Sequence, residues 1–325
     1  MKKDYIKKIL IYIFICFAIS YLLEFLFILP YARSTEMADA LQATSLSALA
    51  MMIPALSVLL TRLFTKEGFI DHKITFNIKE GRIKYYILAW FLPLVLVLLG
   101  AVIYFAVFSE EFDWNMAYYL GNVTKSGTIV TAEALRATMI SQLITGVILG
   151  PVLNCITCFG EEWGWRGYLL PKLMKIMPMY AAIIVDGVIW GLWHLPLIIG
   201  GKNYGFDYDG YPYAGILMMV LFCVVYGIVL SYFTVKTDSC IPAVIGHGAL
   251  NSIASIGIVF SSNGGRMLLG PSITGVLSMI PAMITAVILL VALRHDNACI
   301  KVSSCDTISK VESSGESYIG QDKES

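Results

Sequence analysis

A short charged segment, GEEWGWRG (160–167), follows a long apolar run in this chain of 325 residues. A charge at the centre of a membrane helix costs about 2.5–3.5 kcal/mol, so three charges there require partners or a polar cavity. On a helix, Glu162 and Arg166 are four residues apart with the acid first, which favours an ion pair. Glu161 points about 100° away and has no local partner. Its carboxylate is a candidate for chemistry, although a position in water at the membrane surface would also explain all three charges.

Two histidines and an asparagine lie in other apolar segments. His194 occurs in DGVIWGLWHLPLIIG, and His247 and Asn251 occur in IPAVIGHGALNSIASIG. A lone histidine in a membrane is often a hydrogen-bonding group between packed helices. Several polar side chains in separate apolar segments each need a partner, however, and one shared cluster would satisfy them all. His247 and Asn251 are four residues apart, so one face of a helix presents both.

Such a cluster could activate water for amide hydrolysis. A partly desolvated glutamate can act as general base beside a histidine, while an asparagine and a second histidine stabilise an oxyanion. The set Glu161, His194 and His247 could also hold zinc. The sequence has no H-E-x-x-H signature, so no metal or other cofactor is predicted. Cys155 and Cys158 form a C-x-x-C pair, for which inert thiols in an apolar helix are the favoured interpretation.

Two further acids are in apolar surroundings. Asp186 precedes Trp190 by one helical turn and His194 by two, so it could be a partner of His194 or serve helix packing. Glu24 lies within the first long apolar segment, where an unpaired acid is unfavourable, and no role is assigned to it.

The composition places all these residues in a membrane protein. The chain is 58% hydrophobic and 14% charged, against about 25% charged residues in soluble proteins. Apolar runs of about 20 residues, long enough to cross a bilayer, recur along the chain. We therefore predict an all-α polytopic membrane helix bundle of about eight transmembrane helices with an intramembrane polar site. The predicted spans are 8–29, 42–64, 85–108, 140–165, 180–200, 213–235, 241–260 and 272–293.

The distribution of charge predicts the orientation of the chain. Lysine and arginine alternate onto one side of the predicted spans, which places both termini in the cytoplasm by the positive-inside rule. We expect an integral membrane protein of the plasma membrane. The formal net charge of zero gives no indication of a nucleic-acid partner.

Three motifs in this order resemble the CAAX protease and bacteriocin-processing (CPBP) family of intramembrane glutamate endopeptidases, to which the type II CAAX prenyl endopeptidases are related. The motifs are Glu161-Glu162-x-x-x-Arg166, Trp190-x-x-x-His194 and His247-x-x-x-Asn251. The resemblance implies that Glu161 and His194 activate water and that His247 and Asn251 form the oxyanion site. Glu162 and Arg166 would then be a supporting ion pair.

The resemblance covers residues 140–260, which would be the catalytic core, and it implies a substrate. By hydropathy, residues 1–139 would hold the first three helices and their loops and 261–295 the last helix, and the polar composition of 296–325 predicts a disordered cytoplasmic tail. The implied activity is hydrolysis of a peptide bond in a prenylated CAAX-type protein or a small peptide precursor. The implied partners are this peptide or lipidated protein and membrane lipids. The alternatives are a non-catalytic membrane protein, such as an immunity or scaffold protein, and a transporter.

A shared site makes one structural demand on these elements. The helix that carries GEEWGWRG must continue to about Pro171 and lie buried in the bundle, because only then does Glu161 reach the depth of His194 and His247.

Overall fold

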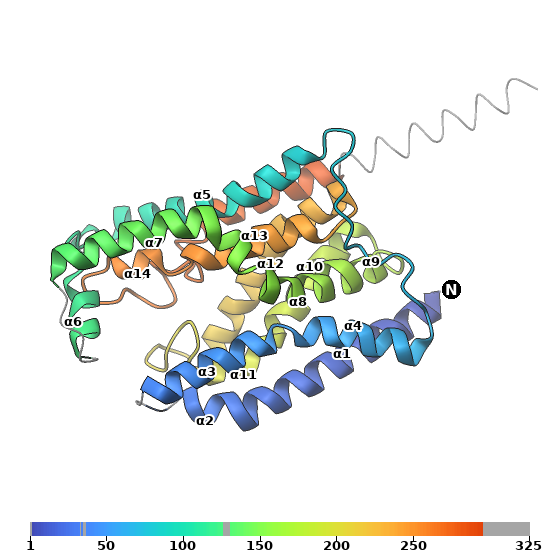
Figure 1. Cartoon of the computed structure of the whole chain (residues 1–325), viewed down its shortest axis with the longest axis horizontal. Coiled ribbons are helices and arrows are strands. Elements are labelled where there is room, and N and C mark those ends of the chain that lie inside the picture. Colours follow the sequence, from blue (N-terminus) through green and yellow to red (C-terminus); the bar gives the residue numbers. More distant parts are fainter. Residues whose placement is uncertain (1, 33, 35–36, 126–130, 295–325) are drawn as a thin grey trace, which may run out of the picture.

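The protein is a bundle of helices (Figure 1). The computed structural model describes residues 2–32, 34, 37–125 and 131–294, so the predicted tail at 296–325 lies outside the described residues. Within these ranges the regular structure is helical, and the only β-interactions are two isolated bridges. The predicted all-α polytopic bundle is therefore confirmed.

Most helices follow one another directly, with longer connections at 66–82, 200–212 and 260–279, and three of the helical segments are π or 3₁₀ segments, labelled η. In chain order they are α1 (Lys2–Leu23), η1 (Glu24–Ile28), α2 (Leu29–Ala32), α3 (Met37–Ala50), α4 (Ile53–Thr65), α5 (Ile83–Val107), η2 (Ser109–Glu111), α6 (Ala117–Lys125), α7 (Ala132–Leu153), α8 (Cys155–Gly164), η3 (Trp165–Leu169), α9 (Leu170–Leu173), α10 (Met179–Trp193), α11 (Leu195–Ile199), α12 (Tyr213–Thr237), α13 (Ile241–Ile253) and α14 (Ile256–Val259). A further apolar helix covers Ile280–Arg294.

Six helical segments in the described ranges are long and apolar enough to cross a membrane. They are Lys2–Ala32, Leu41–Thr65, Ile83–Val107, Glu133–Leu153, Tyr213–Thr237 and Ile241–Val259. The predicted spans at 180–200 and 272–293 correspond to the shorter apolar helices Met179–Trp193 and Ile280–Arg294.

The predicted span at 140–165 differs from the structure because the helix is interrupted at Asn154. Pro151 lies inside the last turn of α7, and a proline removes a backbone hydrogen bond from a helix. The Asn154 side chain then donates a hydrogen bond to the Gly248 carbonyl at 3.2 Å, which attaches the interruption to α13. From Cys155 the chain is helical again through α8, η3 and α9 to Leu173. The demand that the GEEWGWRG segment be helical and buried is confirmed.

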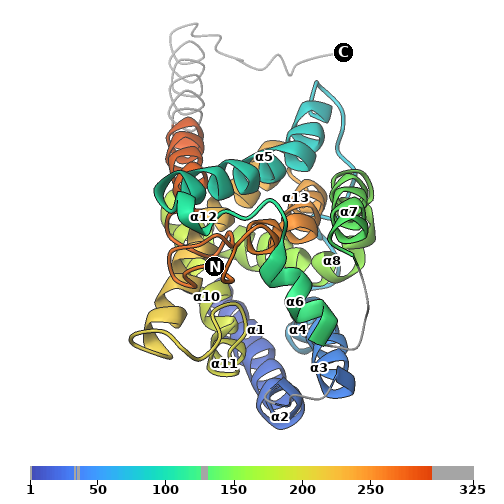
Figure 2. The ribbon, with the colours of Figure 1, turned by 90° about the vertical axis from the view of Figure 1, so that its left-hand side faces the viewer.

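The helix that carries the two glutamates lies between two groups of helices. Figures 1 and 2 show α1, α3 and α4 along one edge of the bundle, and α5 and α7 along the opposite edge. The short helix α8 contacts α4 on one side and α13 on the other, while α10 packs along α12. The polar segments singled out from the sequence therefore meet in the middle of the bundle.

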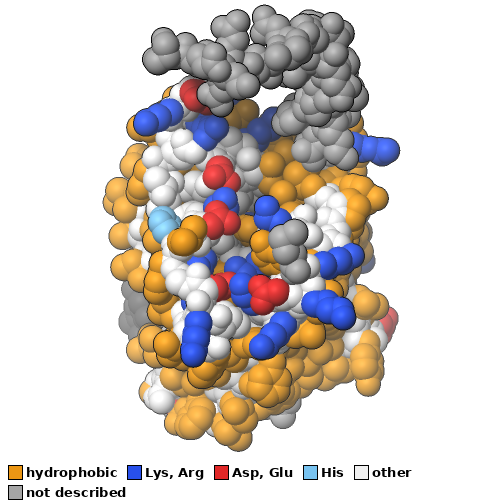
Figure 3. Space-filling view, turned by 90° about the vertical axis from the view of Figure 1, so that its right-hand side faces the viewer, with side chains coloured by type: hydrophobic (Ala, Val, Ile, Leu, Met, Phe, Trp, Pro, Cys, Tyr) orange, Lys and Arg blue, Asp and Glu red, His pale blue; other side chains and the backbone are white. Residues whose placement is uncertain are grey.

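Charged side chains gather on one end face of the molecule. Figure 3 shows lysine, arginine and acidic side chains there, surrounded by hydrophobic ones. Glu67, just after α4, connects this segment with α1 and α9. Its carboxylate lies 3.3 Å from Lys8 of α1 and 3.5 Å from Lys172 of α9. This distribution is the one that the positive-inside rule associates with a cytoplasmic face, and the orientation of the chain stays a prediction.

Close contact between α10 and α12 depends on glycine. A Cβ added at Gly187 would lie 2.7 Å from the Val224 Cα, and one added at Gly191 would lie 2.6 Å from the Val220 Cα. Both distances are too short for any side chain, so these glycines allow the two backbones to approach.

We predict that Gly187→Ala separates α10 from α12 and lowers stability by about 1–3 kcal/mol, the usual effect of overpacking. Thermal unfolding of the purified protein in detergent measures the loss. Gly121→Ala is the matched control, because an added Cβ there meets nothing within 4 Å. Equal melting temperatures for the two variants would contradict the prediction.

Candidate active site

Glu161 and Glu162 are buried because α8 packs closely against the N-terminal helices. A Cβ on Gly160 would lie 2.4 Å from the Met51 carbonyl oxygen, and one on Gly164 would lie 2.5 Å from the Pro54 Cβ. With no side chain at these positions, α8 fits against α4. Glu161 is consequently only 2% exposed and Glu162 is fully buried.

Arg166 compensates the charge of the buried acids around it. It lies in the π-helical segment η3, and its Nη1 is 3.0 Å from Glu162 Oε1, so the predicted ion pair is present. On its other side, Nε lies 3.5 Å from Asp186 Oδ2. Asp186 thus pairs with Arg166. A contact with His194, one of the two roles considered for Asp186, is not among the ion pairs and hydrogen bonds of the described residues. Buried charges of opposite sign can remain ionised where isolated ones cannot.

Glu162 also holds His247 in place. The His247 Nδ1 lies 2.9 Å from Glu162 Oε1, the same oxygen that accepts from Arg166. A carboxylate can only accept a hydrogen bond, so Nδ1 carries the hydrogen and Nε2 is left for another partner. Glu162 therefore connects the charged group on η3 with a histidine on α13.

Trp190 brings the three segments of the site together. Its indole Nε1 donates a hydrogen bond to Glu161 Oε2 at 2.7 Å. Its ring centroid is 5.9 Å from that of His194 and 5.4 Å from that of His247. The guanidinium carbon of Arg166 lies 4.3 Å from the centroid of the same ring, within the range of a cation–π interaction. One indole thus contacts groups from α8, η3, α13 and the end of α10.

His194 lies where α10 ends and α11 begins. Its Nδ1 is 3.0 Å from the Trp190 carbonyl oxygen, and because a carbonyl only accepts, Nδ1 donates and Nε2 is left as an acceptor. The ring also packs edge-on against Trp193 at 4.8 Å between centroids. Trp193 Nε1 in turn donates to Ser20 Oγ at 2.6 Å. The position of His194 therefore depends on α1 as well as on α10.

Asn251 shares a face of α13 with His247 but is not hydrogen-bonded to the cluster. Its side chain is exposed, and Nδ2 lies 3.7 Å from Cys158 Sγ. It lines a cavity of about 190 Å³ together with Gln142 and Ser252. Over the described part of the chain, no hydrogen bond joins Asn251 to Glu161 or to either histidine. Asn251 thus lies at the edge of the cluster, beside a space that a substrate could fill.

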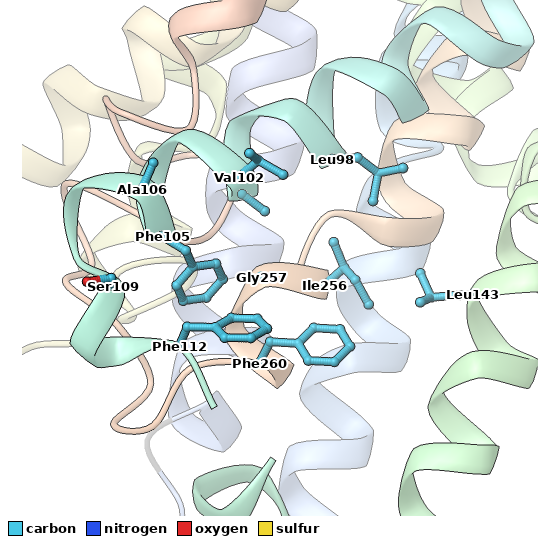
Figure 4. A pocket seen from close by; sticks show the side chains of 11 residues that line it. Leu98, Val102, Phe105, Ala106, Ser109, Phe112, Leu143, Ile256, Gly257 and Phe260 are labelled. Carbon is cyan, nitrogen blue, oxygen red and sulfur yellow. The ribbon is translucent and has the colours of Figure 1, made fainter. Parts of the chain in front are cut away.

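A larger apolar groove adjoins the Asn251 cavity. It has a volume of about 540 Å³ and is lined by side chains of α5, η2, α7 and α14 (Figure 4). Leu143 and Ile256 line both spaces. The groove has hardly any polar atoms, so it is suited to an apolar occupant.

A third cavity lies beside Arg166 and is lined in part by charged side chains. Its volume is about 280 Å³, and Arg166 lines it together with Lys73 and Lys175. This cavity therefore meets the site at the guanidinium that is paired with Glu162.

A metal site was the conditional alternative for Glu161, His194 and His247. Within the described ranges, no group of three or more His, Cys, Asp and Glu side chains is arranged to hold a metal ion. The two histidines direct Nδ1 to protein acceptors, and Glu161 accepts from Trp190.

The sequence interpretation missed two contacts of the site. Trp190 was noted as part of a motif, but its hydrogen bond to Glu161 was not foreseen. Ser20 was not considered at all, although a serine in an apolar helix that also carries Glu24 is a signal of a polar face.

The part of the chain that carries this site is similar to known proteins. Residues 141–253 match the family model described as type II CAAX prenyl endopeptidase Rce1-like. The chain is also similar to CAAX prenyl protease 2 of Methanococcus maripaludis, with 33% identity over 92 residues. The aligned part is 28% of this chain and spans only about a third, 34%, of that relative. The matched region includes every residue of the three motifs, so the part of this chain that carries them is similar to the type II CAAX prenyl endopeptidase Rce1-like family.

Proposed function

We propose that this protein is an intramembrane endopeptidase in which Glu161 and His194 activate a water molecule for attack on a peptide bond. The observation that carries the proposal is the position of Trp190, which contacts Glu161, His194 and His247 with one ring. The family match over 141–253 supports the same reaction class.

Glu161 is suited to the role of general base. Trp190 donates to its Oε2, which orients the carboxylate and leaves the other oxygen for water. In the reaction, Glu161 takes a proton from water as the oxygen attacks the carbonyl carbon. The proton then passes to the leaving nitrogen as the C–N bond breaks. General acid–base catalysis of this kind contributes about 10²–10⁴-fold to a rate.

The histidines have separate tasks in this mechanism. His194, whose Nδ1 is fixed by the Trp190 carbonyl, offers Nε2 to the same water. His247 donates Nδ1–H to Glu162 and, in its doubly protonated form, donates Nε2–H to the oxyanion that forms on the substrate. Asn251 would complete this oxyanion site when a peptide fills the adjacent cavity and meets its amide.

The two cavities fit the needs of hydrolysis in a membrane. The polar cavity lined by Arg166 and Lys73 would supply water from the charged end face, which we assign to the cytoplasm. The cavity at Asn251 and the apolar groove beside it would receive the substrate from within the bundle. We propose a prenylated CAAX-type protein or a small peptide precursor as the substrate, with the plasma membrane as the location.

Glu161→Gln should lower peptidase activity at least about 100-fold, because an amide cannot accept the proton of the attacking water. The rate is measured on purified protein in lipid vesicles with a farnesylated CAAX peptide that carries a fluorophore and a quencher. In cells, mass spectrometry of peptide termini should show that cleavages made by the wild type are absent with the Glu161→Gln variant.

Glu80→Gln is the matched control, because Glu80 is an exposed acid in the turn before α5, far along the chain from the three motifs. It should cleave like the wild type. Full biological activity of the Glu161→Gln variant would instead favour the non-catalytic binding or scaffold function.

Arg166→Met should destabilise the protein by about 3–5 kcal/mol, since it leaves Glu162 and Asp186 as buried acids without a counter-charge. Chemical unfolding in detergent gives this value. Adding Glu162→Gln and Asp186→Asn to the same variant removes the uncompensated charges and should recover much of the loss. Failure of this triple variant to regain stability would show that the guanidinium acts through packing and not through charge.

A further inference from the structure

Glu24 is a buried acid that the proposed mechanism does not use. It begins the π-helical segment η1 and is fully buried. Neither of its carboxylate oxygens has a hydrogen-bond partner in the described structure. A π segment within a helix is frequently found at a functional site, and an unpartnered acid in a membrane helix is costly enough to require a reason.

The acid is the last member of a polar stripe along the first helix. Tyr12, Cys16, Ser20 and Glu24 follow one another at intervals of four residues, and none of them is exposed. This interval places them on one face of the helix. The face is directed to the active-site helices, because Ser20 accepts a hydrogen bond from Trp193.

Further contacts position Glu24 beside the proposed site. The Tyr21 hydroxyl donates to the Leu192 carbonyl at 2.7 Å, which attaches the same part of the first helix to the end of α10. The segment η1 then packs against α11, which begins directly after His194. The stripe also lies against α8, the helix of Glu161, because a Cβ on Gly164 would meet the Tyr12 hydroxyl. The first helix therefore brings a second carboxyl group to the neighbourhood of Glu161.

The charges around the site determine the state of this second carboxyl group. Arg166 already faces Glu162 and Asp186, and His247 faces Glu162, while in the described residues neither oxygen of Glu24 has a partner. Two neighbouring carboxyl groups avoid ionising together, and an isolated buried acid takes up a proton in preference to remaining charged. Glu24 is therefore neutral and has an O–H group to donate.

We propose that Glu24 is a positioning residue of the Glu161 site, where its neutral carboxyl group donates a hydrogen bond to the water that Glu161 deprotonates. The inference rests on the proposed peptidase function. Glu24 keeps its own proton throughout, and the proton of the water passes to Glu161 and then to the leaving nitrogen. In an apolar interior, a water between two polar groups makes more hydrogen bonds than a water bound by Glu161 alone, and is therefore more stable there.

Replacement of Glu24 by leucine separates this role from a structural one. Glu24→Leu removes a buried polar group without a partner, so we expect an unchanged or higher melting temperature in detergent. The kcat for the farnesylated peptide should nevertheless fall at least tenfold, with KM within twofold of the wild type. Glu24→Gln keeps a hydrogen-bond donor and should restore kcat to within about threefold.

The control is Leu26→Ala, in the same π-helical segment but 61% exposed, which should leave kcat unchanged. An unchanged kcat in Glu24→Leu would overturn the proposal. The proposal would also be overturned if Glu24→Leu lost stability and activity together and Glu24→Gln did not restore them, because that result is typical of a structural residue.

An infrared measurement tests Glu24 without a substrate. The wild type should show the C=O band of a protonated carboxyl group that disappears in Glu24→Gln and shifts in Glu161→Gln. Absence of that band, or a band that Glu161→Gln does not shift, would contradict the proposal even if the protein cleaves peptides. The proposed function would be refuted if the wild type cleaved neither the farnesylated peptide nor any cellular peptide. In that case the infrared result would still decide whether Glu24 is linked to Glu161.

Discussion

The buried guanidinium of Arg166 is the positive charge that allows acids to remain in the apolar centre of this bundle. It lies between Glu162 and Asp186 and against the face of Trp190. Through Glu162 it fixes His247, and through Trp190 it is connected to Glu161 and His194. An ion pair of this kind contributes little net stability, so its value here is the fixed arrangement of groups that surround it.

The backbone around these groups is irregular where they need room. The helix is interrupted at Asn154, the chain changes from α10 to α11 at His194, and π-helical segments carry Arg166 and Glu24. Irregular backbone inside a membrane protein is tolerated only where protein or water satisfies its polar groups. The close approach of α10 to α12 at Gly187 and of α8 to α4 at Gly164 provides such surroundings.

Local periodicity was sufficient to foresee some of these contacts. The pair Glu162 and Arg166 follows from an interval of four residues on one helix, and the buried helical course of GEEWGWRG followed from the depth that Glu161 had to reach. Contacts between helices were different. The pairing of Asp186 with Arg166 and the hydrogen bond from Trp190 to Glu161 join positions 20 or more residues apart, where the sequence contains no information about relative rotation. The interruption at Asn154 was also missed, because hydropathy does not detect a proline near the end of an apolar helix.

The contacts of Trp190 with four polar groups have a consequence for molecular recognition. A large ring that is 1% exposed cannot change rotamer without moving the glutamate, both histidines and the guanidinium. If these groups are the proposed catalytic ones, those in contact with Trp190 are fixed before a peptide arrives, and their reorganisation energy is small. Adaptation must then come from the incoming chain. A helical peptide has its carbonyl groups occupied by its own hydrogen bonds, so a segment that unwinds easily would be the better ligand, and discrimination between substrates would depend on local helix stability as much as on side-chain identity.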